Sequence, residues 1–102
     1  MGLLDLIFGS RKKQIKTFLK NGAIILDVRT QREWDNGHIN DSVHIPLDEL
    51  KNRIDEVKKF NKSVIVVCQS GIRAAKASRF LNENNIDATN GGGWATLQTK
   101  KH

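Results

Sequence analysis

The 102-residue chain has one cysteine, Cys68, one proline, no tyrosine and six other aromatic residues, four Phe and two Trp. A single cysteine cannot form an internal disulfide or a thiolate-rich zinc site, which excludes a disulfide-stabilised secreted scaffold and a zinc module. The few aromatic residues do not interleave with basic ones, so we expect no nucleic-acid partner. No apolar run approaches the ~20 residues of a membrane span, so we expect no stable membrane insertion.

The length of the chain predicts one domain. The net charge of the chain does not by itself decide between classes of partner. Seventeen Lys and Arg against eleven Asp and Glu give a formal net charge of +6, which suits small anions, acidic partners and nucleic acid about equally. Residues 1–8 lack the basic region of a secretory signal, and no small-residue cleavage site follows them, so we predict a cytoplasmic location. We divide it into an apolar N-terminal segment, residues 1–10, and a folded domain, residues 11–102.

The N-terminal segment has four apolar side chains on one side of a short helix, namely Leu3, Leu4, Ile7 and Phe8. Gly9-Ser10 is expected to break that helix, with Ser10 as the N-cap of a second one that ends at Lys20. The apolar side chains could dock on the core or form a lightly ordered turn. A dimer contact or a membrane contact is the alternative.

Apolar runs predict two buried strands, at residues 23–28 and 63–67, and weaker patterns predict short strands at 43–45 and 86–89. Thr30 and Glu33 form a capping-box pair that starts a short helix through Trp34. Apolar residues at spacings of three and four predict an amphipathic helix over 47–60, and further helices are predicted over 73–84 and 94–100. Strands that alternate with helices predict an α/β fold with a mainly parallel sheet.

Cys68 directly follows the second buried strand, at the carboxyl end where such sheets gather their ligands. The connecting stretch to the next helix reads Cys68-Gln69-Ser70-Gly71-Ile72-Arg73. Gly71 permits the positive φ with which backbone N–H groups can surround the sulfur. The positive end of the helix and the Arg73 guanidinium favour the thiolate. A free cysteine is most often inert and buried, but this position predicts a nucleophile.

Three ordered blocks of the sequence resemble the single-domain rhodaneses, the thiosulfate sulfurtransferase family. The blocks are Asp27-Val28-Arg29 with Glu33-Trp34, Gly37-His38-Ile39 and Ile45-Pro46-Leu47; then Cys68 to Arg73; then Gly92-Gly93-Trp94. The resemblance runs from about residue 15 to Leu97. It implies a rhodanese-like domain of three layers, in which a central, mainly parallel sheet of four or five strands is flanked by helices.

The resemblance also implies a reaction. Cys68 would take a sulfane sulfur from a small anionic donor, thiosulfate or a persulfide, and pass it as its own persulfide to cyanide or a thiol acceptor. The expected substrate-binding residues are Gln69, Ser70, Gly71, Ile72 and Arg73, whose amides would hold the negative outer sulfur. A protein is a further candidate acceptor, no cofactor or metal is implied, and the oligomeric state stays undetermined. Because the chain has no second thiol, an external acceptor must complete the cycle.

Two other functions stay open from the sequence. One is a module that carries sulfur or binds a protein without turnover. The other is a cysteine phosphatase or arsenate reductase, in which arginine lies six residues after cysteine in a loop wide enough for a tetrahedral oxyanion. Arg73 lies five residues after Cys68, and Val67 stands where those phosphatases often have histidine. The shorter loop favours sulfur transfer but does not separate an enzyme from a carrier.

Asp27, Arg29 and Glu33 are predicted to support the loop. We expect Asp27 and Arg29 to form hydrogen bonds rather than react, because a thiolate nucleophile needs no separate base. Two roles are open for Arg73, which could bind the anionic donor or pair with a carboxylate such as Glu33.

The remaining features favour structural roles. The histidines, His38, His44 and His102, have no partners at metal-ligand spacing. Gly91-Gly92-Gly93 predicts a turn and close packing, and Trp94 is predicted in the core. The family's first edge strand is replaced by a segment, 2–8, that looks helical, which favours four strands over five.

Overall fold

The protein is an α/β domain built on one parallel sheet. The computed structural model describes the backbone of residues 3–100 and the side chains of residues 11–100. Within that part of the chain the sheet has four strands in the order β2-β1-β3-β4, all parallel. They are β1 (Ile24–Asp27), β2 (Val43–His44), β3 (Val64–Cys68) and β4 (Ala88–Gly93). This arrangement confirms the predicted fold class.

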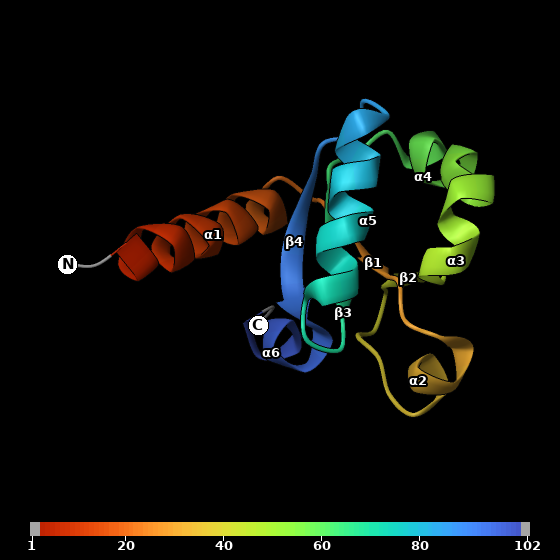
Figure 1. Cartoon of the computed structure of the whole chain (residues 1–102), viewed down its shortest axis with the longest axis horizontal. Coiled ribbons are helices and arrows are strands. Elements are labelled where there is room, and N and C mark those ends of the chain that lie inside the picture. The colour runs from red at the N-terminus through yellow and green to blue at the C-terminus, as the bar shows by residue number, and fades with distance from the viewer. Residues whose placement is uncertain (1–2, 101–102) are drawn as a thin grey trace.

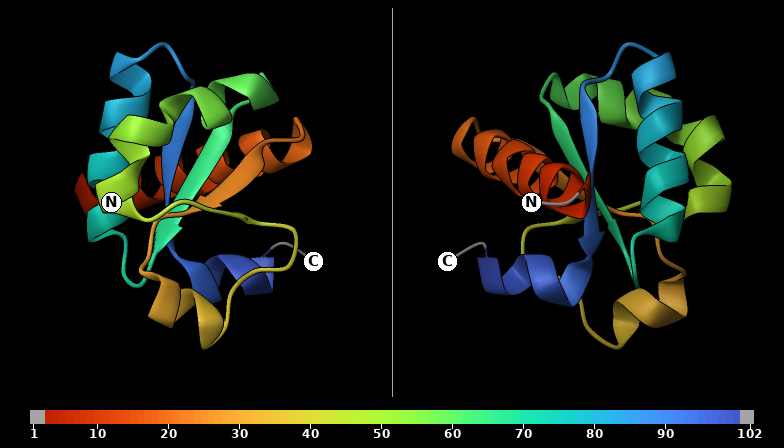
Figure 2. Two further views of the ribbon diagram at one scale, coloured as in Figure 1. Left: turned by 90° about the vertical axis from the view of Figure 1, so that its right-hand side faces the viewer. Right: turned by 60° about the vertical axis from the view of Figure 1, so that its left-hand side comes forward.

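Helices cover both faces of the sheet, as Figures 1 and 2 show. They are α1 (Leu3–Lys20), α2 (Gln31–Asp35), α3 (Leu47–Leu50), α4 (Ile54–Phe60), α5 (Ile72–Glu83) and α6 (Trp94–Lys100). One core cluster joins the sheet to α3, α4 and α5, and a second joins it to α1 and α6. The domain therefore has three layers, with α2 lying beyond the carboxyl ends of the strands.

Alternation along β3 decides which way the cysteine points. Val64 and Val66 pack with α5, whereas Ile65 and Val67 pack with α1 and α6. Because successive side chains of a strand point to opposite faces, Cys68 shares the α5 face with Val66. All five residues of β3 are buried, as expected for a strand covered on both sides.

The N-terminal helix is longer than predicted. The prediction that Gly9-Ser10 breaks it, with Ser10 as an N-cap, is wrong, since α1 runs without interruption from Leu3 to Lys20. An internal glycine costs a helix only about 1 kcal/mol relative to alanine, which propagation on both sides can offset. The predicted apolar patch, Leu3 to Phe8, lies outside the residues whose side chains are described. Among the described residues, no helix is long and apolar enough to cross a membrane.

The predicted helix over 47–60 is three shorter pieces, α3, a 3₁₀ turn (Lys51–Arg53) and α4. The apolar residues Leu50 and Val57 are buried as their spacing predicts. Arg53 leaves the helical region, with φ −117° and ψ 18°, and its guanidinium binds Glu49 and Glu56. A single 3₁₀ turn changes the period too little for the apolar spacing to reveal it.

The three glycines at 91–93 belong to a strand, so the predicted turn is wrong while the predicted close packing is confirmed. A Cβ on Gly91 would lie 2.5 Å from Cγ2 of Ile65, and one on Gly93 would lie 2.8 Å from the carbonyl oxygen of Gln69. The register between β3 and β4 shifts between Val66 and Val67. Glycine is thus required because β4 lies against both β3 and the loop after it.

Candidate active site

Cys68 ends β3, and its sulfur accepts two backbone hydrogen bonds. The N–H of Gly71 lies 2.9 Å from Sγ, and the N–H of Ala74 lies 3.4 Å from it. Ala74 is the third residue of α5, so no carbonyl within the helix can accept a hydrogen bond from its N–H. The partial positive charge of the helix N-terminus is therefore directed at the sulfur.

Gly71 makes this geometry possible. It is the N-cap of α5, with φ 104° and ψ −9°, a conformation that side-chain-bearing residues rarely adopt. A Cβ at this position would also lie 3.3 Å from Cα of Gly92 in β4. The loop is thus confined between its own helix and the neighbouring strand.

Asn90 ties β4 to the loop, a contact that the sequence analysis missed. Its Nδ2 donates to the carbonyl of Gly71 at 3.0 Å, and its Oδ1 accepts from the N–H of Gly92 at 2.8 Å. An amide that bonds both segments fixes the distance between them. The sequence gives only one local signal for Asn90, its position before three glycines. That signal points to a turn, because Asn-Gly pairs are most often found in turns.

Arg73 pairs with Glu33 on α2. The two guanidinium nitrogens lie 2.7 and 2.9 Å from the two carboxylate oxygens, a bidentate geometry. The hydrogen bond from Arg73 is the main cause that lowers the pKa of Glu33 from 4.5 to about 2, and the Glu33 carboxylate raises the pKa of Arg73 in turn. Of the two roles left open for Arg73, the structure shows the pairing with a carboxylate.

The carboxylate of Glu33 is held in place by the start of α2. Thr30 is the N-cap, and both hydrogen bonds of the predicted capping box are present. The Oε1 atom of Glu33 accepts from the Thr30 N–H at 3.0 Å as well as from Arg73. One side chain thereby caps α2 and joins it to the first turn of α5.

Asp27 and Arg29 form a buried ion pair beside the loop, with side chains 0% and 2% exposed. The Nε and Nη2 atoms of Arg29 lie 2.8 to 3.0 Å from the carboxylate of Asp27. Nη2 also donates to the carbonyl of Gly37 at 2.7 Å, and the guanidinium lies 4.6 Å from the ring centroid of Trp94. Trp94, predicted in the core, is only partly buried and contacts the core from its edge.

Trp34 is stacked between two histidines, an arrangement that the sequence did not reveal. Its ring centroid lies 3.5 Å from that of His38 and 4.6 Å from that of His44. The Nδ1 atom of His38 lies 2.8 Å from the carbonyl of Trp34, and Nε2 of His44 lies 2.8 Å from that of Arg29. The stack links α2 to β2, in agreement with the structural roles expected for His38 and His44.

The rim of the loop is more exposed than its centre. Cys68 is 1% exposed, whereas Gln69 and Ser70 are exposed and Ile72 is 72% exposed. Any molecule that reaches the sulfur passes these rim residues. Among the side chains described, those of residues 11–100, no group of three or more His, Cys, Asp or Glu could hold a metal ion.

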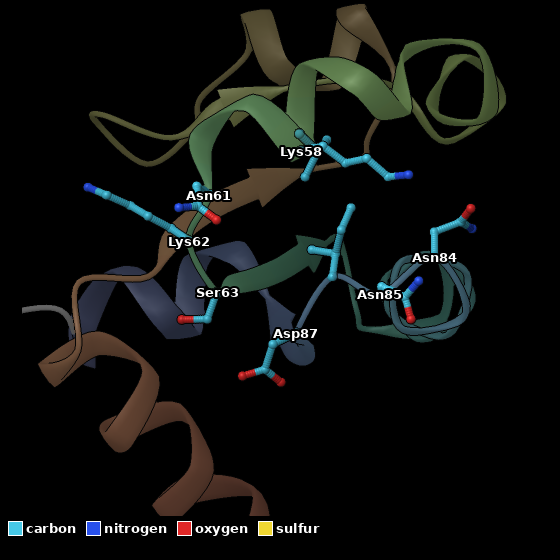
Figure 3. Close-up of a pocket in the computed structure, with 9 residues that line it drawn as sticks. Lys58, Asn61, Lys62, Ser63, Asn84, Asn85 and Asp87 are labelled. Carbon is cyan, nitrogen blue, oxygen red and sulfur yellow. The ribbon is translucent and has the colours of Figure 1, made fainter.

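A separate hollow of about 510 Å³ lies at the opposite ends of the strands. Figure 3 shows Lys58, Asn61 and Lys62 on one side of it, and Asn85 and Asp87 on another. These residues precede β3 and β4, whereas Cys68 ends β3. This hollow therefore takes no part in chemistry at the cysteine.

Comparisons with known proteins agree with this geometry. The model of the rhodanese-like domain family matches residues 11–96. The uncharacterized protein YqhL of Bacillus subtilis is 37% identical over 62 residues, which cover 61% of this chain and 48% of that protein. The putative sulfur carrier protein YrkF of the same organism is 39% identical over 62 residues, 61% of this chain and 33% of YrkF. The chain spans about half or less of the length of these relatives.

Solved structures show the same fold. A rhodanese-like domain protein from Staphylococcus aureus is 32% identical, with a TM-score of 0.70 over 84% of this chain and 85% of that one. The Bacillus anthracis protein CoADR-RHD is 35% identical, with a TM-score of 0.70 over 87% of this chain and 16% of that one. Because the family model covers most of the chain, the protein belongs to the rhodanese-like domain family.

Proposed function

We propose that this protein is a sulfurtransferase that carries a sulfane sulfur on Cys68. The observation that carries the proposal is the position of Sγ, which accepts the N–H groups of Gly71 and Ala74 at the N-terminus of α5. These donors and the positive end of the helix are placed to stabilise the negative charge that the sulfur carries during the reaction.

In the first step the Cys68 thiolate attacks the sulfane sulfur of a donor, with thiosulfate as the simplest case. A bond forms between Sγ and that sulfur, the sulfur–sulfur bond of thiosulfate breaks, and sulfite leaves with the electron pair. The product is a Cys68 persulfide whose outer sulfur is negative. The amides of Gln69, Ser70, Gly71, Ile72 and Arg73 are proposed to stabilise that charge.

In the second step an external acceptor attacks the outer sulfur. Cyanide leaves as thiocyanate, or a thiolate becomes a persulfide, and the Cys68 thiolate is released unchanged. No oxidant or reductant is consumed, so no cofactor is needed. Asp27, Arg29 and Glu33 are proposed to hold the loop in position without contacting the substrate, because the charge of each is paired.

A sulfur carrier without turnover is the second candidate. Two observations favour it: Cys68 is 1% exposed, and the relative YrkF is named a putative sulfur carrier protein. A sulfur atom bound at the bottom of the loop would be shielded from unselective thiols and released only to a partner that fits the rim.

The test is steady-state thiosulfate:cyanide sulfurtransferase activity. We expect thiocyanate from the unmodified protein and none from Cys68→Ser, which keeps the size of the side chain. Sulfur loading without thiocyanate indicates the carrier. If the protein shows no loading and forms no thiocyanate, both the sulfurtransferase and the carrier are contradicted. An aryl phosphate serves as the control substrate: hydrolysis that depends on Cys68 would contradict sulfur transfer and favour phosphatase chemistry.

A further inference from the structure

The exposed face of α5 begins at the rim of the active-site loop with an apolar residue and continues with cations. Ile72 is 72% exposed and Phe60 41%, the two large hydrophobic side chains exposed among the described residues. Ile72 is the first residue of α5, directly after the loop. A partner that covers this side chain removes its apolar surface from water, which favours binding at the mouth of the site.

Lys76 and Arg79 lie on the same side of α5 as Ile72, because residues four and seven positions apart share a helix face. Both are exposed, and neither appears in the ion pairs formed among the described residues. We call Ile72, Lys76 and Arg79 the α5 ridge. Figure 1 shows α5 along the outside of the sheet, with no other element over its outer side.

The charges of the ridge differ from those beneath the loop. Arg29 and Arg73 are each paired with a carboxylate, so little of their charge remains for a partner. Lys76 and Arg79, which form no ion pair among the described residues, therefore add positive charge along the helix face that starts at the rim. Glu83 is the one acid on this face of the helix, and it lies farthest from the loop.

A hollow of about 520 Å³ between α1, α5 and β4 extends the ridge. Arg11 and Arg79 line it, with Glu83 at one side and Asn90 at another. Asn90 also hydrogen-bonds the carbonyl of Gly71, so the hollow adjoins the active-site loop. A chain that lies along the ridge can thus reach from the rim into this hollow, where Arg11 adds one further cation.

We propose that the α5 ridge docks the sulfur-exchange partner, a protein segment whose cysteine is flanked by an apolar residue and then by acidic residues. The inference rests on the proposed function. Lys76 and Arg79 lie about 6 and 10 Å from Ile72 along the helix axis, which matches roughly two and three residues of extended chain. The acidic residues of the partner therefore lie within about four positions beyond its apolar residue, on the side of the extended chain that faces the ridge.

The reacting atoms are those of the second step. The partner's thiolate attacks the outer sulfur of the Cys68 persulfide, the bond between the two sulfurs breaks, and the Cys68 thiolate leaves. The partner becomes a persulfide, and nothing else is oxidised or reduced. The ridge contributes only to the encounter and its orientation.

Short synthetic cysteine peptides test the ridge. The acidic peptide has leucine beside the cysteine and two glutamates beyond the leucine. The basic peptide has lysines in place of the glutamates, and the alanine peptide has alanine in place of the leucine. Each is mixed with the persulfide-loaded full chain, and the loss of the persulfide is followed by mass spectrometry. We expect the acidic peptide to react roughly ten-fold faster than the basic one at low ionic strength, and the difference to shrink at high salt.

Two double variants separate the ridge from net charge. Lys76→Glu with Arg79→Glu should abolish the preference for the acidic peptide while discharge to cyanide stays unchanged. Lys58→Glu with Lys62→Glu makes the same charge change at the far ends of the strands (Figure 3) and should keep much of the preference. Equal effects of the two double variants would contradict docking on the ridge and show that the preference depends only on the overall charge of +6.

The apolar contact has its own control. Ile72→Ser should remove the advantage of the leucine peptide over the alanine peptide, whereas Phe60→Ser should keep it. A leucine advantage that survives Ile72→Ser, or equal rates for all three peptides, overturns the proposal while discharge to cyanide still supports the proposed function. Failure to form a persulfide at all contradicts the proposed function, and the docking proposal fails with it.

Discussion

Replacement of Gly71 by alanine should damage the stability and the chemistry of the protein together. At φ 104° an alanine enters a region that costs a side-chain-bearing residue about 1 to 2 kcal/mol. Its Cβ would also lie 3.3 Å from Cα of Gly92, so the backbone of the loop or of β4 must shift. We expect a loss of roughly 2 to 3 kcal/mol in the free energy of unfolding, which lowers the Tm by about 10 °C or more.

Gly22 provides a matched control for this variant. It has φ +80°, but a Cβ there would meet nothing within 4 Å. Gly22→Ala therefore introduces backbone strain alone, and we expect it to cost about 1 kcal/mol. Because Gly22 follows α1, at the amino end of β1, the variant should load sulfur at the normal rate.

Thermal unfolding and the rate of sulfur loading from thiosulfate separate the two effects. Gly71→Ala displaces the N–H that lies 2.9 Å from Sγ, so we expect loading to slow roughly ten-fold or more. Gly71 has no special role if Gly71→Ala loads sulfur as fast as Gly22→Ala and unfolds at the same temperature.

Three further substitutions test the contacts around the loop. Glu33→Gln removes the ion pair with Arg73 and should lower the free energy of unfolding at pH 7 by about 1 to 2 kcal/mol, a modest loss because the pair is partly exposed. Because the pKa of Glu33 is lowered from 4.5 to about 2, this difference is present above pH 4.5 and disappears as the pH falls towards 2. Urea unfolding at several pH values measures it. Arg29→Lys should destabilise by about 3 kcal/mol in the same assay, because lysine cannot make the fork to Asp27, and a change within 0.5 kcal/mol would contradict this. Gly93→Ala should block sulfur loading, since its Cβ would meet the Gln69 carbonyl at 2.8 Å, and normal loading would show that the loop can move aside.

The strands and the place of the cysteine could be predicted because they depend on local patterns. Continuous apolar runs occur where both faces of a strand are covered, as in β1 and β3. The capping box at Thr30 and Glu33 is also a local signal, and both of its hydrogen bonds form. Since parallel strands end at one edge of the sheet, the location of Cys68 followed from its position after such a run.

The contacts that complete the site depend on segments far apart in the sequence. The choice between the two roles of Arg73 needed the distance to Glu33, 40 residues earlier. Asn90 bonds Gly71 across 19 residues, and nothing in the local pattern of either residue indicates the other. The glycines of β4 suggest a turn until the close approach of β3 and the loop is known.

The most direct test of sulfur transfer is the intact mass of the protein after incubation with thiosulfate. We expect the unmodified chain to gain the mass of one sulfur atom, fragmentation to place this sulfur on Cys68, and a thiol or cyanide to remove it. Cys68→Ser should gain nothing. A chain that gains no sulfur, or gains it equally as Cys68→Ser, would contradict the central claim.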